Sequence, residues 1–375
     1  MAVCLAVCTV CLWPAVTLAA ASAPVLAAAE AAAKAAAPGA SKGQAVAAAA
    51  PGSAASASKA SAASSSADAG ASPAAAASTA STASAASAAQ AASAAEAASA
   101  ASAAVAAASK RAVDVAAHLD PRDALKLRDS FESDVTRRLA VPPADQQAYA
   151  QRLQAALAEK GLGALARQYV VLVDRNPNVQ ALFLYFRGNP TDAWALIGAS
   201  PVSTGLPGRY DHFVTPIGVF DHSPQNMDFR AEGTLNENGI RGYGARDMRI
   251  FDFGWTDAER GWGKGGMSSM RFQMHATDPE KLEPLLGIRH SKGCVRIPNS
   301  LDRFLDHHGI LDAQYQAIAD AGIALWVLHV DRATTPWAGR YLVVVDSGAK
   351  ARPSWSPQPK REIRARMPDA ADTAD

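Results

Sequence analysis

Cysteine is nearly absent from this chain, and the residues and motifs that are missing narrow its possible functions. Three of the four cysteines lie within the first eleven residues, so the rest of the chain has only Cys294 and cannot form an internal disulfide. Beyond the first eleven residues there is no CxxC pair, and the chain has no HExxH motif and no Walker-type glycine-rich loop for phosphate. A formal net charge of +1 over 375 residues gives no strong field toward nucleic acid. We therefore expect no cofactor, no metal and no nucleic-acid partner.

Charge is also absent from the segment 1–22, which runs through apolar residues into small ones. This pattern is typical of a secretory signal peptide or, if it is not cleaved, of a membrane anchor. The basic residues that usually begin a signal peptide are missing, because none precedes Lys34, and this indicates a translation start upstream of Met1. We predict export to the periplasm or cell envelope, with membrane contact only through this segment if it remains uncleaved.

Large side chains are rare in residues 23–109, which consist mostly of alanine and serine. Such a segment has little apolar surface to bury and cannot offset the entropy of ordering its backbone. We therefore predict a disordered, flexible tether over 23–109. The end of the chain, from about residue 350, is charged and rich in proline, which predicts a disordered tail.

Residues 110–167 change to a helical pattern. Apolar residues at helical spacing follow the start signal Asp120–Pro121, and a second amphipathic stretch ends at Gly161. These two stretches predict a helical hairpin over 110–167, before the main domain.

From residue 168 the pattern is that of a mainly β domain, which we assign to 168–331. Seven β-rich runs, separated by glycine-rich loops, are QYVVLVD, VQALFLYFR, AWALIGAS, HFVTPIGVF, MRIFDFG, MRFQMHA and IALWVLHV. Two short helices, each followed by a glycine at its end, interrupt them. The run GRYLVVVDS in 332–375 predicts one more strand before the tail.

The lone thiol has neighbours suited to nucleophilic catalysis. Gly293 allows a tight turn, so the backbone N–H groups of Lys292, Gly293 and Cys294 can converge on an oxyanion. The charge of Lys292 also favours a thiolate. His275, at the end of the run MRFQMH, is the predicted base, because the chain between it and Cys294 is long enough to return alongside that strand.

The other histidines are weaker candidates. His290 is close to the thiol in sequence, but spacing on a loop does not fix geometry. His307 and His308 end a predicted helix, where histidine suits the helix dipole. His212 and His222 lie in predicted loops that could line a cleft.

The stretch MHATDPEKLEPLLGIRHSKGCVRIP resembles the signature of the L,D-transpeptidase (YkuD-like) catalytic domain family. That family has a histidine followed later by Ser/Thr-His-Gly-Cys, an aliphatic residue and often arginine, and Ser291, Gly293, Cys294 and Arg296 match this run. A second stretch, VSTGLPGRYDHFVTPIGVF, is similar to the family's Ser-Thr-Gly turn and Thr-Pro-x-Gly-x-Phe run. The resemblance covers 168–331.

The resemblance implies a fold and a reaction. The fold is a mostly antiparallel L,D-transpeptidase-like β-sandwich with short helices, here preceded by the helical hairpin and the disordered Ala/Ser-rich segment. The substrate is a peptidoglycan stem peptide, whose diamino acid is attacked by Cys294 at its L-centre carbonyl. His275 is the base and then the proton donor to the departing terminal D-amino acid, and the acyl group passes to an amine without any metal.

The resemblance also assigns supporting roles. The carbonyl of Ala276, where the family usually has glycine, orients the base. Lys292 stands where the family has histidine, and we expect this change to alter pH dependence or substrate choice. Arg296 and Ser291 are candidates for substrate binding, although Arg296 could instead form a structural ion pair and Ser291 could brace the loop. Tyr243 could reach the cleft.

Three other functions stay open. The same site with water as acceptor would be a cell-wall peptide hydrolase, either an L,D-carboxypeptidase or an enzyme that releases cross-links. A non-catalytic cell-wall binding protein could have kept the fold, although the presence of His275, Gly293 and Cys294 together disfavours this. A cysteine protease of unrelated fold gains nothing from the second stretch.

Overall fold

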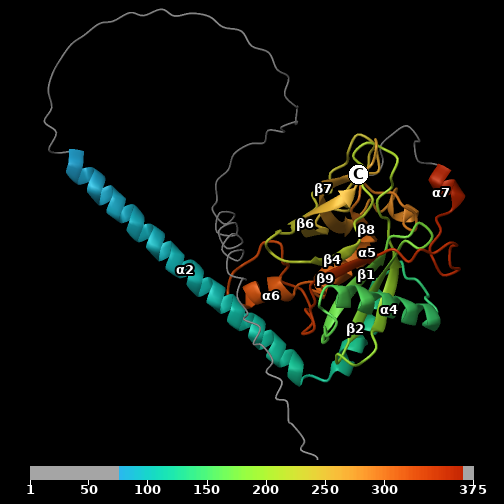
Figure 1. Cartoon of the computed structure of the whole chain (residues 1–375), viewed down its shortest axis with the longest axis horizontal. Helices are drawn as coiled ribbons and strands as arrows, with labels where there is room; N and C mark the ends of the chain where they lie inside the picture. The colour runs from blue at the N-terminus through green and yellow to red at the C-terminus, as the bar shows by residue number, and fades with distance from the viewer. Residues whose placement is uncertain (1–75, 366–375) are drawn as a thin grey trace, which may run out of the picture.

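The computed structural model describes residues 76–365, with side chains from residue 90 onward. The predicted export segment 1–22 and the tether up to residue 75 therefore lie outside the described residues, as does the end of the tail. Two β-sheets and several helices form the body of the protein, and one long helix extends away from it (Figure 1).

The larger sheet has five strands in the order β3-β2-β1-β9-β4. All neighbours are antiparallel except β1 and β9, which are parallel. Its strands are β1 (Gln168–Asp174), β2 (Ala181–Arg187), β3 (Ala195–Pro201), β4 (Gly218–Asp221) and β9 (Tyr341–Val345). The run predicted as an optional extra strand is thus an interior strand of this sheet, beyond the predicted domain limit at residue 331.

The smaller sheet has four strands in the order β5-β6-β7-β8. The pairs β5–β6 and β6–β7 are antiparallel, whereas β7 and β8 are parallel. Its strands are β5 (Phe229–Arg230), β6 (Arg249–Glu259), β7 (Met267–Ala276) and β8 (Val295–Ile297).

The two sheets pack against each other through one hydrophobic core. The strand β1 contributes Val171 and Val173 to it, and β7 contributes Phe272 and Met274, all of them fully buried. Since side chains alternate along a strand, the other face of β1 points away from this core. There Val170 and Leu172 pack under a helix, so β1 reads as a continuous apolar run.

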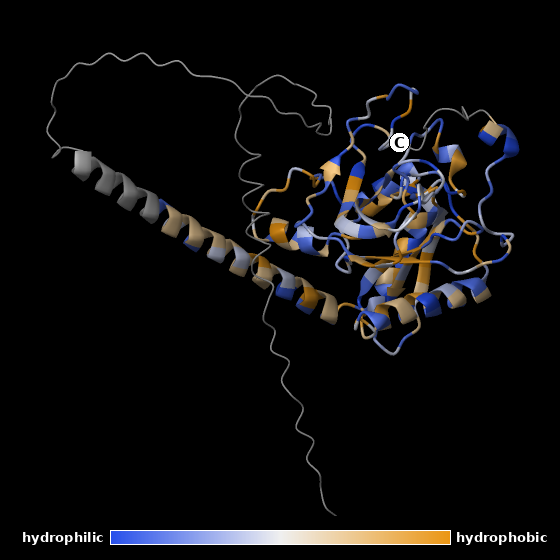
Figure 2. Ribbon diagram, turned by 45° about the horizontal axis from the view of Figure 1, so that its top comes forward, coloured by the Kyte–Doolittle hydropathy of each residue, from blue (hydrophilic) through white to orange (hydrophobic). Residues whose placement is uncertain are grey.

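Helices cover the outer side of the larger sheet, and the helix α5 packs against β6 and β7 of the smaller one. The helix α4 lies over β1 and β2, and its residues alternate between hydrophobic and hydrophilic (Figure 2). The shorter helices and 3-10 turns are η1 (Pro121–Lys126), α3 (Leu127–Asp134), α4 (Pro143–Glu159), η2 (Glu283–Leu285), α5 (Asn299–His307), α6 (Ala313–Asp320) and α7 (Arg361–Ala365).

The long helix α2 (Ala76–His118) has 43 residues, which corresponds to about 65 Å. Its C-terminal half contacts α6, and Ala116 is buried in the core between the sheets. Arg167 fixes its end by donating hydrogen bonds to the carbonyls of Ala116 and Leu119. The prediction of a disordered tether is therefore wrong for residues 76–109, where the high helix propensity of alanine prevails.

The stretch Gln90–His118 of α2 is long and apolar enough to cross a membrane by length and composition, and 6% of that window is buried. The same stretch includes the part of α2 that packs on the body of the protein, where Ala108 is 2% exposed.

Residues 119–167 form separate short elements rather than a helical hairpin. The helix α3 packs against β3, where the ring of Phe131 lies over Gly198 so closely that a Cβ would come within 2.2 Å of it. The helix α4 instead covers the larger sheet. Tertiary packing on the sheet separates the two amphipathic stretches, so the fold as a whole is mixed α/β and the mainly β prediction is too narrow.

Two further expectations fail at the C-terminal end. The run IALWVLHV forms turns rather than a strand, with Val330 fully exposed. The segment after residue 350 is ordered through α7, since the Trp355 ring packs edge-on against Tyr149 at 6.0 Å and Phe183 at 5.9 Å. The indole N–H of Trp355 also donates to Asp145, so this tail is part of the folded body.

Candidate active site

The thiol and the predicted base lie on neighbouring strands. The chain leaves β7 after Ala276 and returns as β8, whose parallel register sets Arg296 opposite His275 and Val295 opposite Met274. Continued by one residue, this register sets Cys294 level with Gln273. Paired residues of neighbouring strands point to the same face, so Cys294 and His275 share one face of the smaller sheet.

That face is the outer one, away from the core. Met270, Phe272 and Met274 of β7 belong to the core between the sheets, and the residues that alternate with them point the other way. These are Arg271, Gln273 and His275. On this face Arg271 is exposed, whereas Gln273 and His275 are buried. Cys294 is partly buried and packs against the neighbouring core cluster.

The ring of His275 is held in one tautomer. Its Nδ1 lies 2.6 Å from the carbonyl oxygen of Ala276. A carbonyl can only accept, so Nδ1 carries the proton and Nε2 is left as a hydrogen-bond acceptor. The Tyr243 ring packs edge-on against the imidazole with centroids 4.7 Å apart. The Ala276 carbonyl thus contacts the His275 ring directly, as its predicted role requires.

Burial lowers the pKa of His275 to about 3, with a further lowering from the positive charge of Arg296 and an opposing effect of the Ala276 hydrogen bond. Burial also raises the pKa of the Cys294 thiol to about 11, while a backbone hydrogen bond at Gln273 and the charge of Arg296 act in the opposite direction. At neutral pH the resting pair is therefore a thiol and a neutral imidazole rather than a thiolate and an imidazolium.

The sulfur lies over β7. Cys294 is half-buried, and its Sγ is 3.9 Å from the carbonyl oxygen of Arg271. The charge of Arg296 favours the thiolate. A contribution from the charge of Lys292 stays a prediction. The backbone carbonyl of Lys292 helps to hold the loop, since it accepts from the Phe213 amide at 3.0 Å.

Ser291 braces the cysteine loop from inside. Its hydroxyl donates to the carbonyl of Cys294 at 2.7 Å and accepts from the Gly293 amide at 3.2 Å. Ser291 is 1% exposed, so its hydroxyl is a structural group rather than a substrate-binding one. Of the three amides predicted to stabilise an oxyanion, that of Gly293 is already engaged in this bond.

The second sequence stretch supports the cysteine loop directly. The hydroxyl of Thr215 donates to the Gly293 carbonyl at 2.7 Å and accepts from the Gly205 amide at 2.9 Å. Gly293 has φ +134°, and a Cβ there would meet Met270 at 2.8 Å and Phe213 at 3.1 Å. Glycine is therefore required at this position both by conformation and by space.

Arg296 is a buried residue, 2% exposed. Its Nη1 donates to the carbonyl of His290 at 2.6 Å and lies 3.4 Å from that residue's ring nitrogen. Its backbone forms a two-way bridge with Ser203. Arg296 therefore holds the loop and acts on the thiol and the imidazole by its charge, and His290 is its contact rather than the base.

Three side chains of this face went unrecognised in the sequence. Asp252, fully buried on β6, accepts from the Nε of Arg271 at 2.7 Å and from the side-chain amide of Gln273 at 2.8 Å. A β-bulge follows Asp252, with Gly254 at φ +80° inside it. Bulges of this kind re-aim side chains near active sites. The alternation in MRFQMH could have revealed Arg271 and Gln273, but nothing local pointed to Asp252.

The remaining histidines have other contacts. His222 is fully buried, with Nε2 2.9 Å from Asp228 and Nδ1 2.9 Å from the Leu311 carbonyl. Ring nitrogens of two others lie near backbone carbonyls, namely His212 with Leu206 and His308 with Ala333. His307 is exposed and lines a pocket elsewhere.

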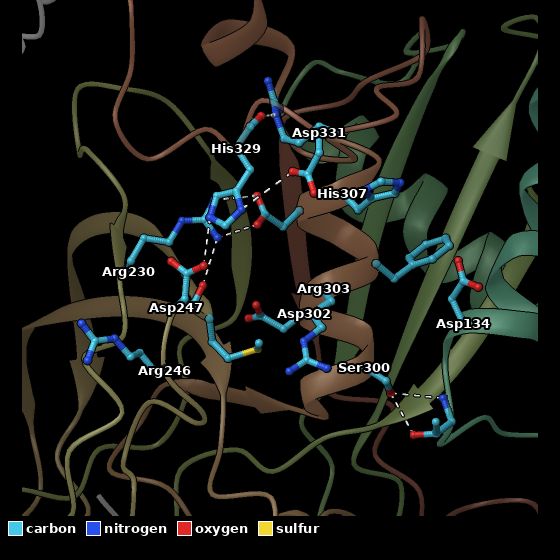
Figure 3. A pocket seen from close by; sticks show the side chains of 15 residues that line it. Asp134, Arg230, Arg246, Asp247, Ser300, Asp302, Arg303, His307, His329 and Asp331 are labelled. Carbon is cyan, nitrogen blue, oxygen red and sulfur yellow. Dashed lines mark hydrogen bonds and ion pairs between the residues drawn. The ribbon is translucent and has the colours of Figure 1, made fainter.

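That pocket, of about 550 Å³, is lined by residues of α5 and by Arg230, Arg246 and Asp247. Asp302 and Arg303 project into it from α5, opposite Arg246 and Asp247 (Figure 3). Asp302 is buried and accepts from the Ala276 amide at 3.2 Å, and burial raises its pKa to about 8. The pocket contains neither the thiol nor the base, so its size does not make it the reaction site.

No family model matches the chain, and no curated protein matches it. A solved structure of a fused Zn-dependent amidase/peptidase/peptidoglycan-binding domain-containing protein from Clostridium acetobutylicum is 14% identical, with a TM-score of 0.19. The match covers 56% of this chain and 66% of that one, just under two thirds of its length. A likeness at this level supports no statement about the fold or the function.

Within residues 76–365, no group of three or more His, Cys, Asp or Glu side chains is arranged to hold a metal ion. The chemistry available on the described face is that of a thiol, an imidazole of fixed tautomer, and two arginines with one buried carboxylate.

Proposed function

We propose that this protein is a peptidoglycan L,D-transpeptidase, which uses Cys294 to form an acyl-enzyme with a stem peptide. One observation carries the proposal: a buried histidine of fixed tautomer shares the outer face of two paired strands with the described free thiol. The resemblance of two separate stretches to that family agrees with this pairing, and the Thr215–Gly293 bond physically joins those stretches.

The first half-reaction begins from the neutral pair. As Sγ of Cys294 bonds to the carbonyl carbon of the diamino acid, the thiol proton moves to Nε2 of His275. The imidazolium that forms is stabilised by the Ala276 carbonyl at Nδ1. It then gives its proton to the nitrogen of the terminal D-amino acid, the C–N bond breaks, and a thioester remains on Cys294.

Backbone amides of the cysteine loop stabilise the oxyanion of the tetrahedral intermediate. In comparable sites the loss of one donor costs about 3–4 kcal/mol of transition-state stabilisation. Because the Gly293 amide already donates to Ser291, it is the least suited of the three predicted donors. The positive charge of Arg296 adds to the stabilisation of both thiolate character and oxyanion.

The second half-reaction transfers the acyl group to an amine of another stem. The amine attacks the thioester carbonyl, its proton passes to His275, and the C–S bond breaks to regenerate the thiol. With water in place of the amine, the same site would release a shortened stem and act as a cell-wall peptide hydrolase. In both reactions the atoms balance without an oxidant or reductant.

The proposal is tested by incubating the purified protein, and its Cys294→Ala variant, with tetrapeptide muropeptides and reading the products by mass spectrometry. Loss of one terminal D-residue together with dimer formation, both absent in the variant, supports transpeptidation. Cysteine-dependent tripeptide without dimers supports the hydrolase. If no stem type gives a product that depends on Cys294, the proposed function is wrong. Equal melting temperatures of the two proteins are the control for folding.

A further inference from the structure

The outer face of β7 carries a polar group on each side of the thiol. Side chains on one face of a strand repeat about every 7 Å. The thiol stands level with Gln273, so His275 lies about 7 Å along the strand in one direction and Arg271 about 7 Å in the other. A guanidinium is therefore presented near the reacting sulfur, on the side opposite the base.

Arg271 is held in place by a single edge of its guanidinium. Its Nε donates to Asp252 at 2.7 Å, whereas its side chain remains 41% exposed. Asp252 is itself fixed, because it also accepts from Gln273 at 2.8 Å and from the Gly254 amide at 2.8 Å. This contact is made by Nε, and the terminal Nη groups of a guanidinium have the fork geometry that binds carboxylates.

The other arginine of the face is much less accessible. Arg296 is 2% exposed and donates to the His290 carbonyl within the protein. Beside the thiol the two guanidiniums face the one carboxylate of Asp252, while the carboxylates of Asp257 and Glu259 lie farther along the same face of β6. The accessible guanidinium of Arg271 is therefore the group beside the thiol that favours an anionic part of the substrate. Trp255, opposite Arg271 on β6 and 68% exposed, adds an apolar surface on the same face.

We propose that Arg271 binds a carboxylate of the donor stem peptide and so positions its carbonyl carbon over Cys294. This inference rests on the proposed function and deepens it, because it names the part of the substrate that the site recognises. The bond is made by the Nη groups, with Asp252 as the positioning residue that aims them. The exposed ring of Trp255 packs against the aliphatic part of the residue that carries the carboxylate.

A stem peptide has two carboxylates that could meet Arg271: that of the terminal D-residue and that on the side chain of the diamino acid. We therefore compare three donors: a tetrapeptide stem ending in D-alanine, the same peptide with its terminal carboxylate amidated, and the same peptide with the side-chain carboxylate amidated. The carboxylate whose amidation raises KM is the one that the site recognises. Since these measurements use the unaltered protein, they do not depend on a variant that folds.

Arg271→Gln and Arg271→Lys then assign the effect to this residue. For wild type we expect amidation of the recognised carboxylate to raise KM at least 10-fold, with kcat changed less than 3-fold. In Arg271→Gln the same amidation should change KM by less than 2-fold. Arg271→Lys keeps a positive charge beside Asp252 but loses the planar guanidinium. Its change in KM on amidation should therefore lie between those of wild type and Arg271→Gln. Arg303→Gln, an exposed arginine of α5 beside the other pocket, is the matched control and should behave as wild type.

The proposal is overturned if wild type and both Arg271 variants lose the same factor on amidation, or if neither amidation affects wild type. Failure of the proposed function is a separate result, namely no turnover that depends on Cys294. In that case calorimetry of the three peptides with the Cys294→Ala variant asks the same question about binding. At least 10-fold weaker binding of one amidated peptide, abolished by Arg271→Gln in that background, supports the subsite, and equal binding of all three rejects it.

Discussion

Two buried histidines of this protein have opposite properties. His222 faces the buried carboxylate of Asp228, and its pKa is raised, because the attraction to that carboxylate outweighs the cost of burial. Burial lowers the pKa of His275 to about 3, the positive charge of Arg296 lowers it further, and the hydrogen bond to the Ala276 carbonyl offsets only part of this lowering. Burial alone therefore does not decide the charge of a histidine, and the partner does.

The surroundings of the two residues fit different tasks. His222 belongs to a network in which Asp228 also accepts from Arg249 at 2.7 Å, and Arg249 bonds Asp312 at 2.7 and 2.8 Å. All these side chains are buried, so each charge is paired with others. The imidazole of His275 has an unprotonated Nε2 on a face with an accessible thiol. The first arrangement stabilises the fold, and the second is suited to accept a proton.

The largest expected effect is on activity. His275→Gln keeps a polar side chain but removes the base, so kcat/KM of Cys294-dependent turnover should fall about 1,000-fold. His222→Gln should keep activity within about 10-fold of wild type in the folded protein, because His222 contacts no group of the thiol face. The measurement is the rate of release of the terminal residue. Comparable activity losses in both variants would break the distinction drawn between the two histidines.

The reactivity of the thiol sharpens the same comparison. With a pKa of about 11, the Cys294 thiol should react with iodoacetamide at pH 7 about 100-fold more slowly than an ordinary cysteine. The rate should rise about tenfold per pH unit toward pH 11, because only the thiolate reacts. His275→Gln should not change the rate at pH 7. A plateau near pH 7 that is lost in this variant would instead indicate a thiolate–imidazolium pair.

Stability should respond to the other histidine. His222→Gln removes one member of a buried charge network and should lower the free energy of unfolding by about 3 kcal/mol. His308→Gln, which changes a half-buried histidine outside this network, should cost less than about 1 kcal/mol. Denaturant unfolding of the three proteins measures this. A cost for His222→Gln no greater than that of the His308 control would contradict the structural role of the network.

The pH dependence of the free energy of unfolding should also distinguish His275 from His222. The folded pKa of His275 is depressed, so the unfolded chain binds a proton below about pH 6.5 while the folded protein does not. Between pH 6.5 and 5 wild type should therefore lose about 2 kcal/mol through this residue, and His275→Gln should not. The folded pKa of His222 is raised, so its contribution is complete below about pH 6.5 and is lost as pH rises through the raised value.

Unfolding of both variants and wild type at pH 5 and pH 8 tests these signs. The gap between His275→Gln and wild type should shift in favour of the variant at pH 5. The gap between His222→Gln and wild type should be larger at pH 5 than at pH 8. A shift of the same sign for both would show that the two environments do not differ as described.

Local patterns in the sequence predicted part of this site. The run MRFQMH alternates core and polar residues, so the outward direction of His275 could be read from it. The length of chain before Cys294 predicted a return alongside the same strand, and the structure has β8 there. Both features depend on residues that are close in the sequence, so they can be predicted from the sequence alone.

Features that depend on distant contacts were not predictable. Asp252 meets Arg271 only because a bulge turns β6, and β9 enters the sheet beside β1 from far along the chain. Trp355 is ordered by rings of Tyr149 and Phe183, although its own segment is charged and rich in proline. The sequence also did not reveal that the Gly293 amide donates to the Ser291 hydroxyl and is therefore engaged within the loop. The largest error of the sequence analysis was at α2, where an alanine-rich segment predicted to be disordered forms a helix.

The most direct test of the central claim is to trap the acyl-enzyme. The protein is mixed with a tetrapeptide stem, quenched in acid within the first turnovers, and analysed by intact and peptide mass spectrometry. The account predicts a mass increase equal to the tripeptide acyl group, located on Cys294, absent in Cys294→Ala and much slower to form in His275→Gln. Turnover without an adduct on Cys294, or with equal rates in His275→Gln, would contradict it.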